Sequence, residues 1–418
     1  MDVRTGIAAI VAAHKVIPLN NTPTDVAEPL EIISERTATA KIFDIGNGER
    51  QAHIYPCPVH YKTPEGTFVS IDPAVKRKPL LDPLPGFQYE VKSGLYHAHF
   101  DKDRPWNYRF CLGDAWVEYE ALFEESESLT IKVETSRVGV KETVTLKDKS
   151  ALVKLQWRVT WSSGESVIIT PAIAAVDASG KRVPASTSES DGVLTCELDI
   201  SGATFPITVD PSSVVATNDG FVNSADATFD TARNAAAGDY ADASSLSIGL
   251  TKPSTYSVYR TFCSFAIPDM SAVSAASFFA YGLSDASTTD FEIYIHTSTY
   301  SDPLVKEDFD LFDGHQATGA YNGTVLNNTW DSSSYSATWN EIVFNAAGKS
   351  AVLAKKADTL KLVLISKEDF ADSAPTGSEG VMFCPSTESG KEPYLSITFT
   401  PPQLPAPRNM DTFRHRRV

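Results

Sequence analysis

The stretch Phe205-Pro206-Ile207-Thr208-Val209-Asp210-Pro211 decides how this chain of 418 residues is organised. It closes one long segment rich in strand patterns and opens a second segment with a pattern of its own. We therefore predict an all-β fold with two antiparallel β-sandwich domains, jelly-roll-like, at residues 36–211 and 212–400. Extended arms are expected to flank them, an N-terminal arm and linker at 1–35 and a C-terminal arm at 401–418.

Polar and apolar residues alternate on both sides of this hinge. Residues 40–45 and 50–55 flank the turn Gly46-Asn47-Gly48, which has the residue types that tight hairpins need. In the second segment, residues 256–265 and 394–399 show the same period of two. This period predicts antiparallel sheets with one buried face and one wet face.

Composition excludes several classes of partner. A net charge of -17 repels the phosphates of nucleic acids and of anionic membranes, so we expect neither as a partner. The apolar run at residues 6–13 is about half the length of a spanning helix, and no other run approaches the ~20 residues that one needs. A secretory signal is not expected either.

Cysteine and histidine spacing gives little support for a bound metal. The five cysteines show no Cys-x-x-Cys pair, so we interpret most of them as reduced core residues. His97 and His99 would share one face of a strand and could bind a metal, but no third ligand stands nearby in sequence. We therefore favour two ordinary histidines. No cofactor is expected, and Ca²⁺ stays open because Asp308, Asp310 and Asp313 only partly match a calcium loop.

Residues 35–210 carry a family resemblance. Its motifs come in a fixed order and include Arg36-Thr37, Phe43-Asp44, Gly46-Asn47-Gly48, Pro58-Val59-His60-Tyr61-Lys62, Ile71-Asp72-Pro73 and the closing 205–211 stretch. This order resembles the β-rich N-terminal region of bacterial wall-associated and repeat-toxin surface proteins. The repeat array and toxin of those proteins are missing here, so their delivery function is not carried over.

The second segment resembles the DNRLRE family of β-sandwich modules. The matching features are Arg260 followed by Phe262 and Phe265, the Ile267-Pro268 turn, and the late strand at Pro393-Tyr394-Leu395. Phe262 and Ser264 stand where the family has Leu and Lys. The resemblance implies a module found on secreted proteins that act on polysaccharides and in phage virion proteins, some members of which bind polysaccharide.

Aromatic side chains are the expected sugar-binding groups, because the C–H faces of sugar rings stack on flat aromatic surfaces. The candidates for glycan binding are Tyr300, Tyr321, Trp330, Tyr335 and Trp339, with Tyr256 and Tyr281 beside them. The alternative is that Trp330 and Trp339 pin a long loop onto the sandwich, because tryptophan is usually well buried.

The C-terminal arm combines closely spaced prolines with a positive end. Proline density favours an extended conformer, and Arg408, Arg414, Arg416 and Arg417 could dock on an acidic patch of another subunit. A disordered terminus is the alternative.

Three functions compete at this point. The first is a non-enzymatic structural protein of a tailed bacteriophage virion, made in the host cytoplasm and placed on the capsid as a decoration or on the tail. Its partners would be other virion proteins, further copies of itself and a host surface polysaccharide. The second is a bacterial cell-surface or secreted carbohydrate-binding protein, and the third is a polysaccharide-degrading enzyme. No Gly-rich phosphate loop, Gly-x-Ser-x-Gly elbow or His-Glu-x-x-His run occurs in the sequence, which disfavours the enzyme. We favour the first function over the second because no secretory signal is expected, and because it accounts for the two modules and the terminal arms.

Overall fold

A computed structural model describes residues 29–63, 65–71, 76–77, 87–92, 96–101, 103–112, 115–135, 139–151, 154–161, 174–178, 183–210, 213–214, 219–252, 255–388 and 390–402. The chain divides into two compact units, residues 1–30 and 31–418, and the described residues belong almost wholly to the second. Most of the two predicted arms, including Arg408, Arg414, Arg416 and Arg417, lies outside the described residues.

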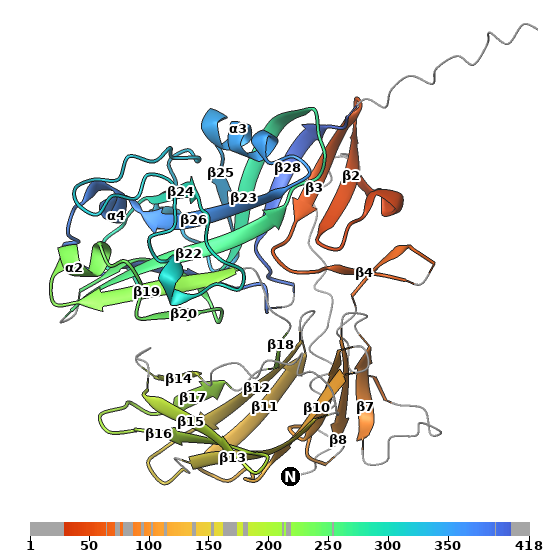
Figure 1. The fold of residues 1–418 in the computed structure, drawn as a ribbon, viewed down its shortest axis with the longest axis vertical. Helices are drawn as coiled ribbons and strands as arrows, with labels where there is room; N and C mark the ends of the chain where they lie inside the picture. Colours follow the sequence, from red (N-terminus) through yellow and green to blue (C-terminus); the bar gives the residue numbers. More distant parts are fainter. Residues whose placement is uncertain are drawn as a thin grey trace, which may run out of the picture. The chain divides into compact units, whose positions relative to one another are not determined.

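Antiparallel sheets dominate the described structure, which confirms the prediction of an all-β chain with β-sandwich modules (Figure 1). The short helices are α2 (Phe229–Arg233), α3 (Ala346–Ala354) and α4 (Lys367–Ala371), and the 3₁₀ turns are η1 (Ile33–Glu35), η2 (Lys306–Asp308) and η3 (Ser332–Ser334). None of the helices in the described ranges is long and apolar enough to cross a membrane.

Residues 76–214 build one β-sandwich, which we call the insert module. Its first sheet has the order β15-β16-β13-β10-β9-β8-β7-β6. These strands are β6 (Lys76–Arg77), β7 (Phe87–Lys92), β8 (His97–Asp101), β9 (Tyr108–Leu112), β10 (Ala115–Ala121), β13 (Lys154–Trp161), β15 (Ala185–Ser190) and β16 (Val193–Leu198).

The second sheet of the insert module closes the sandwich. It contains β11 (Leu129–Thr135), β12 (Gly139–Leu146), β14 (Ala174–Asp177), β17 (Ile207–Asp210) and β18 (Ser213–Val214). Both sheets bury alternate residues in one core, with Trp157 from the first sheet and Val144 from the second. Trp157 also donates a hydrogen bond from Nε1 to the buried Glu142, at 3.1 Å.

Residues 31–71 and 219–402 build a second module, which we call the composite module. Its large sheet contains β1 (Leu30–Glu31), β2 (Ala40–Gly46), β3 (Glu49–Ile54), β19 (Asp219–Asp226), β20 (Tyr240–Asp242), β21 (Leu246–Thr251), β22 (Tyr256–Ala266), β23 (Ala272–Asp285), β24 (Ile293–Thr297), β25 (Trp339–Val343), β26 (Thr359–Ser366), β27 (Glu379–Phe383) and β28 (Tyr394–Thr400). A separate hairpin pairs β4 (His60–Lys62) with β5 (Phe68–Ser70).

The sequence-based prediction places residues 36–211 in one domain. In the structure, the β2–β3 hairpin belongs instead to the large sheet of the composite module. The hairpin itself forms as the sequence predicts, with its turn at Gly46 to Glu49. However, β3 pairs with β28, so that Ile54 lies opposite Leu395 and Ala52 opposite Ile397. The physical reason is shared burial, because these apolar side chains all belong to the core of the composite module. The free edge of β28 also gains a hydrogen-bonding partner.

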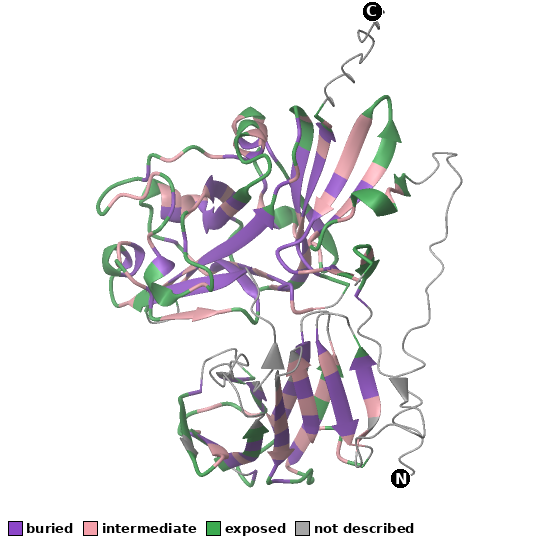
Figure 2. Ribbon diagram, turned by 45° about the vertical axis from the view of Figure 1, so that its right-hand side comes forward, coloured by how far each residue is buried: buried purple, intermediate pink, exposed green. Residues whose placement is uncertain are grey.

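β22 is buried on both faces from Arg260 to Phe265, so its polar residues Arg260, Thr261 and Ser264 are buried together with its apolar ones. Cys263 and Phe265 point into the core shared with β23, where the rings of Phe265 and Phe278 pack edge to face at 6.2 Å. Arg260 and Phe262 face the opposite way, and Phe262 lies in a second cluster with Tyr300 and Phe309. Figure 2 shows the resulting concentration of buried residues in the centre of this module.

A buried arginine and aspartate join separate segments of the composite module. Arg260 is fully buried and donates two hydrogen bonds to Asp369 of α4, at 2.8 and 2.9 Å. It also donates to the carbonyl oxygens of Phe309 and Arg233 and to the hydroxyl of Tyr321. These bonds satisfy a charge that would otherwise be very costly to bury.

A second buried arginine completes this network. Arg233 of α2 donates from Nε to the backbone oxygen of Asp369 at 2.6 Å and lies 3.8 Å from the centre of the Tyr321 ring. Its Nη1 also lies 3.5 Å from Asp372, whose side chain is 29% exposed. Arg233 Nε also lies 3.5 Å from Asp369 Oδ1, so this carboxylate faces two guanidinium groups. The segments α2, β22, α4 and the loop before β25 therefore meet around Arg260 and Asp369.

We predict that Asp369→Asn destabilises the protein strongly. The substitution leaves Arg260 buried without its anionic partner, which typically costs about 3–5 kcal/mol. Chemical denaturation measures the free energy of unfolding. The matched control is Asp372→Asn, which we expect to cost no more than ~1 kcal/mol because that carboxylate is partly exposed. Equal losses for the two variants would show that the network is not a special support of the fold.

Candidate functional site

The composite module carries a row of aromatic side chains on the outer face of its sheet. Five neighbouring strands contribute, in the order β2, β3, β28, β23 and β25. We define the aromatic row by its members Phe43, His53, Tyr394, Phe279, Tyr281 and Trp339. Strand alternation puts them there, because residues next to them, such as Ile42, Leu395 and Phe278, point into the core.

The rings of the aromatic row contact one another across the strands. Phe43 and His53 have centroids 4.9 Å apart, and His53 and Tyr394 are 4.8 Å apart. Tyr394 stacks on Phe279 at 4.8 Å with an angle of 4° between the planes, and it meets Trp339 at 5.3 Å. Contacts of this kind stabilise the sheet and also hold the rings in fixed positions.

Part of the surface of the aromatic row is exposed to solvent. Trp339 is 40% exposed, and the other five members are half-buried. Tyr281 lies between Trp339, at 5.4 Å, and the ammonium group of Lys391, 5.0 Å from the ring centre. A continuous apolar strip with one well-exposed tryptophan is therefore available to a flat ligand.

Polar groups flank the aromatic row on the same face. Glu341 lies opposite Phe279 in the β23–β25 pairing, and Gln51 donates a hydrogen bond to Ser396 at 3.1 Å. Burial lowers the pKa of His53 to about 4, with a further contribution from Lys41, so the imidazole in the row is neutral at neutral pH. Burial and then the charge of Glu341 raise the pKa of Tyr394. The face thus combines neutral rings with charged and amide groups at its borders.

The sequence-based glycan candidates do not come together in the structure. Trp339 lies in the aromatic row, and Tyr281 joins it there. Tyr300 and Tyr321 are buried in the cluster that surrounds Phe262, while Trp330 is buried in the core beside Phe383. The alternative that Trp330 and Trp339 pin the long loop between β24 and β25 agrees with the burial of Trp330, whereas Trp339 is 40% exposed on β25.

Two further candidates pack against the module as structural residues. The ring of Tyr335 lies 5.9 Å from Phe383 and against Gly282, where an added Cβ would meet the tyrosine oxygen at 2.7 Å. Tyr256 is half-buried and lies 5.8 Å from Phe229 of α2.

Sequence reasoning missed four members of the row, namely Phe43, His53, Phe279 and Tyr394. Each stands at an outward position of an alternating strand, so the signal was present strand by strand. What the sequence did not show was that β3 and β28 are neighbours, and this pairing joins the two halves of the row.

The oxygen-rich loop that resembled a calcium site is held together by its own hydrogen bonds. Asp308 is buried and accepts from the backbone nitrogens of Ser301 and Val305, both at 2.8 Å. Asp313 accepts from the backbone of Thr324 at 3.2 Å. These contacts give both carboxylates a structural task in the loop, and Ca²⁺ binding stays a prediction.

One buried carboxyl group titrates near neutrality. Glu379 of β27 is 3% exposed, and burial followed by the nearby charge of Glu368 raises its pKa to about 7. Burial likewise raises the pKa of Glu368. A shallow hollow of about 280 Å³ lies between residues 297–299 and 355–361, and neither glutamate lines it. Glu379 and Glu368 are therefore two nearby carboxyl groups whose negative charges destabilise the folded protein.

We predict that Glu379→Gln stabilises the protein above pH 7 and has little effect near pH 4.5. In the native protein the carboxyl keeps its proton up to about pH 7, whereas in the unfolded chain it loses the proton near its ordinary pKa. The wild type therefore loses stability as the pH rises from 4.5 through 7, and the amide does not. Urea denaturation across this range measures the difference, with the exposed Glu307→Gln as the control. A constant difference between wild type and Glu379→Gln at all pH values would contradict the prediction.

Comparisons with known proteins add little. No protein-family model matches the chain, and no curated protein does. Among solved structures, one similarity is to the isomalto-dextranase of Arthrobacter globiformis T6 in complex with panose, with 10% identity and a TM-score of 0.15. The match covers 63% of this chain and 37% of that one. The chain thus spans well under half of that structure, and a likeness this weak carries no argument about function.

Proposed function

We propose that this chain is a non-enzymatic structural protein of a tailed bacteriophage virion that binds a host surface polysaccharide through the aromatic row. The row is the observation that carries the proposal. Its rings are fixed by contacts across five strands, Trp339 is 40% exposed, and polar side chains border the strip. A preorganised apolar strip with polar borders suits sugar rings, which have apolar faces and hydroxyl edges.

The cysteines support assembly in a reducing compartment. All five, Cys57, Cys111, Cys196, Cys263 and Cys384, are free thiols, and all but Cys111 are buried. Reduced core thiols are typical of proteins that fold in the cytoplasm, where phage particles are built. The resemblance to DNRLRE modules is compatible with this proposal, because such modules occur in virion proteins as well as on secreted proteins. Display on the capsid or the tail, in several copies, would bring the aromatic row to the host surface.

The alternative function is a bacterial cell-surface or secreted carbohydrate-binding protein. The aromatic row favours it equally, because sugar stacking does not depend on what carries the module. The two differ in where the protein is found.

We predict that Trp339→Ala weakens polysaccharide binding by about tenfold or more. Loss of an exposed anchoring indole in a contact surface commonly costs more than about 1.4 kcal/mol, which corresponds to that factor. A glycan array identifies the ligand, and titration calorimetry with it gives the affinity. The control is Leu283→Ala, which removes another exposed apolar side chain, from β23, and is expected to bind the glycan like the wild type. Unchanged affinity of Trp339→Ala for a bound glycan would rule out the row as its site.

We predict that the protein co-purifies with phage particles through a density gradient. Mass spectrometry of the particle fraction should find this chain at a fixed ratio to the major capsid protein. Recovery from the cell envelope or the medium of a phage-free culture would favour the bacterial alternative.

A further inference from the structure

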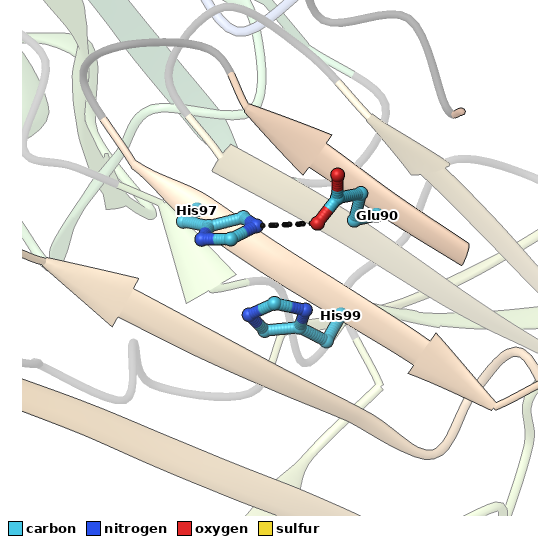
Figure 3. Close-up of side chains that lie close together, drawn as sticks. All are labelled: Glu90, His97 and His99. Atoms are coloured by element: carbon cyan, nitrogen blue, oxygen red, sulfur yellow. Dashed lines mark hydrogen bonds and ion pairs between the residues drawn. The ribbon is translucent and has the colours of Figure 1, made fainter. Parts of the chain in front are cut away.

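Glu90, His97 and His99 form a cluster on the first sheet of the insert module (Figure 3). β7 and β8 pair so that Glu90 lies directly opposite His99, and His97 follows the same face two residues away. His97 Nε2 lies 3.1 Å from Glu90 Oε2, and the two imidazole centroids are 3.9 Å apart. One ligand atom from each residue lies within 4.8 Å of the other two.

The sequence alone favoured two ordinary histidines because no third ligand stood near them. The third group is Glu90, seven residues before His97 on the neighbouring strand. The alternation of residues 87–92 was its only signal. Strand pairing makes these residues neighbours, which spacing along the chain does not show.

The strands that carry the cluster pack against the core of the insert module. On the reverse side of the same strands, Val91, Ala98 and Phe110 are buried in the core of the insert module. On β9, Arg109 lies opposite His99, and both its Nε and Nη2 donate to Glu118, at 3.0 and 2.7 Å. The carboxylate of Glu118 offsets the positive charge of Arg109, so the guanidinium repels a cation at the two imidazoles less strongly.

Burial and charge at the cluster suit a cation. Glu90 is 7% exposed and His99 is 4% exposed, whereas the side chain of His97 keeps 33% of its surface in solvent. An ion can therefore enter past His97. The carboxylate of Glu90 already attracts one cation, because the ammonium group of Lys92 lies 3.1 Å from its Oε1.

We propose that Glu90, His97 and His99 bind a divalent transition-metal ion of the zinc class. Two imidazoles and a carboxylate are ligands that Zn²⁺ takes in a four-coordinate site, with water in the remaining position. Ca²⁺ and Mg²⁺ are disfavoured because they need six or more oxygen ligands or a near-octahedral oxygen shell. The ion would join β7 to β8, the strands next to the edge strand β6. This inference is independent of the polysaccharide proposal, since the residues lie in the other module.

Lys92 gives the proposal a distinctive test. Its ammonium group lies 3.1 Å from Glu90 Oε1 and competes with a metal for the carboxylate. Lys92→Ala should therefore bind Zn²⁺ more tightly than the wild type. A cluster with a purely structural role would gain nothing from this substitution.

Titration calorimetry of the full-length, tag-free and metal-stripped protein with ZnCl₂ tests the site. We expect one saturable site per chain, and affinity at least about tenfold weaker in Glu90→Gln and in His99→Ala. Glu120→Gln, on β10 of the same sheet, is the matched control and should bind like the wild type. Circular dichroism checks that each variant is folded.

Cobalt absorption identifies the ligands. Co²⁺ bound to two imidazoles and a carboxylate gives visible bands without the near-ultraviolet charge-transfer band of thiolate ligation. That thiolate band, the absence of saturable zinc binding, or equal affinity of Glu90→Gln and Glu120→Gln would each overturn the proposal. Weaker binding by Lys92→Ala would also count against it.

Discussion

The charge of Arg260 is the constraint on which the composite module depends. A guanidinium group with no exposed surface must find all its partners inside the protein, and Asp369, Tyr321 and two backbone carbonyls provide them. The partners come from three segments of the chain: Arg233 from α2, Phe309 and Tyr321 from the loop before β25, and Asp369 from α4. The arginine therefore specifies where α2, α4 and the loop before β25 must lie. The Arg260–Asp369 pair contributes more to the positioning of these segments than to the net free energy of folding. The attraction within a buried ion pair does little more than offset the cost of removing both charges from water.

The same network explains why the long loop between β24 and β25 is well packed. Phe309, Phe312 and Tyr321 surround the guanidinium of Arg260, at 3.9, 5.1 and 5.5 Å from their ring centres. Trp330 then fixes the end of the loop in the main core. Tyr321 and Trp330, which sequence reasoning assigned to sugar binding, are thus buried as parts of the core. The partly exposed rings of the aromatic row lie instead on the outward faces of regular strands.

Local patterns predicted the strands well and their partners poorly. The period of two at residues 40–55 and 256–265 identified β2, β3 and β22, and the Gly46-Asn47-Gly48 turn identified the hairpin. Alternation shows which residues share a face, but it does not show which strand lies beside another when hundreds of residues intervene. Both candidate sites depend on that missing information. Tyr394 reaches His53 only through the β3–β28 pairing, and Glu90 reaches His97 only through the β7–β8 pairing.

The β3–β28 pairing has a consequence for how the protein is made. Gln51 and Ser396 form a hydrogen bond although they are 345 residues apart in the chain. A ribosome adding about 5–20 residues per second would need roughly 17 to 70 s to deliver the second strand after the first. Throughout that interval the hairpin waits with an open edge, a state that invites pairing with the wrong chain. The composite module can be completed only after β28, which ends at Thr400, has been made, while the described strands of the insert module are all present once Val214 has been added.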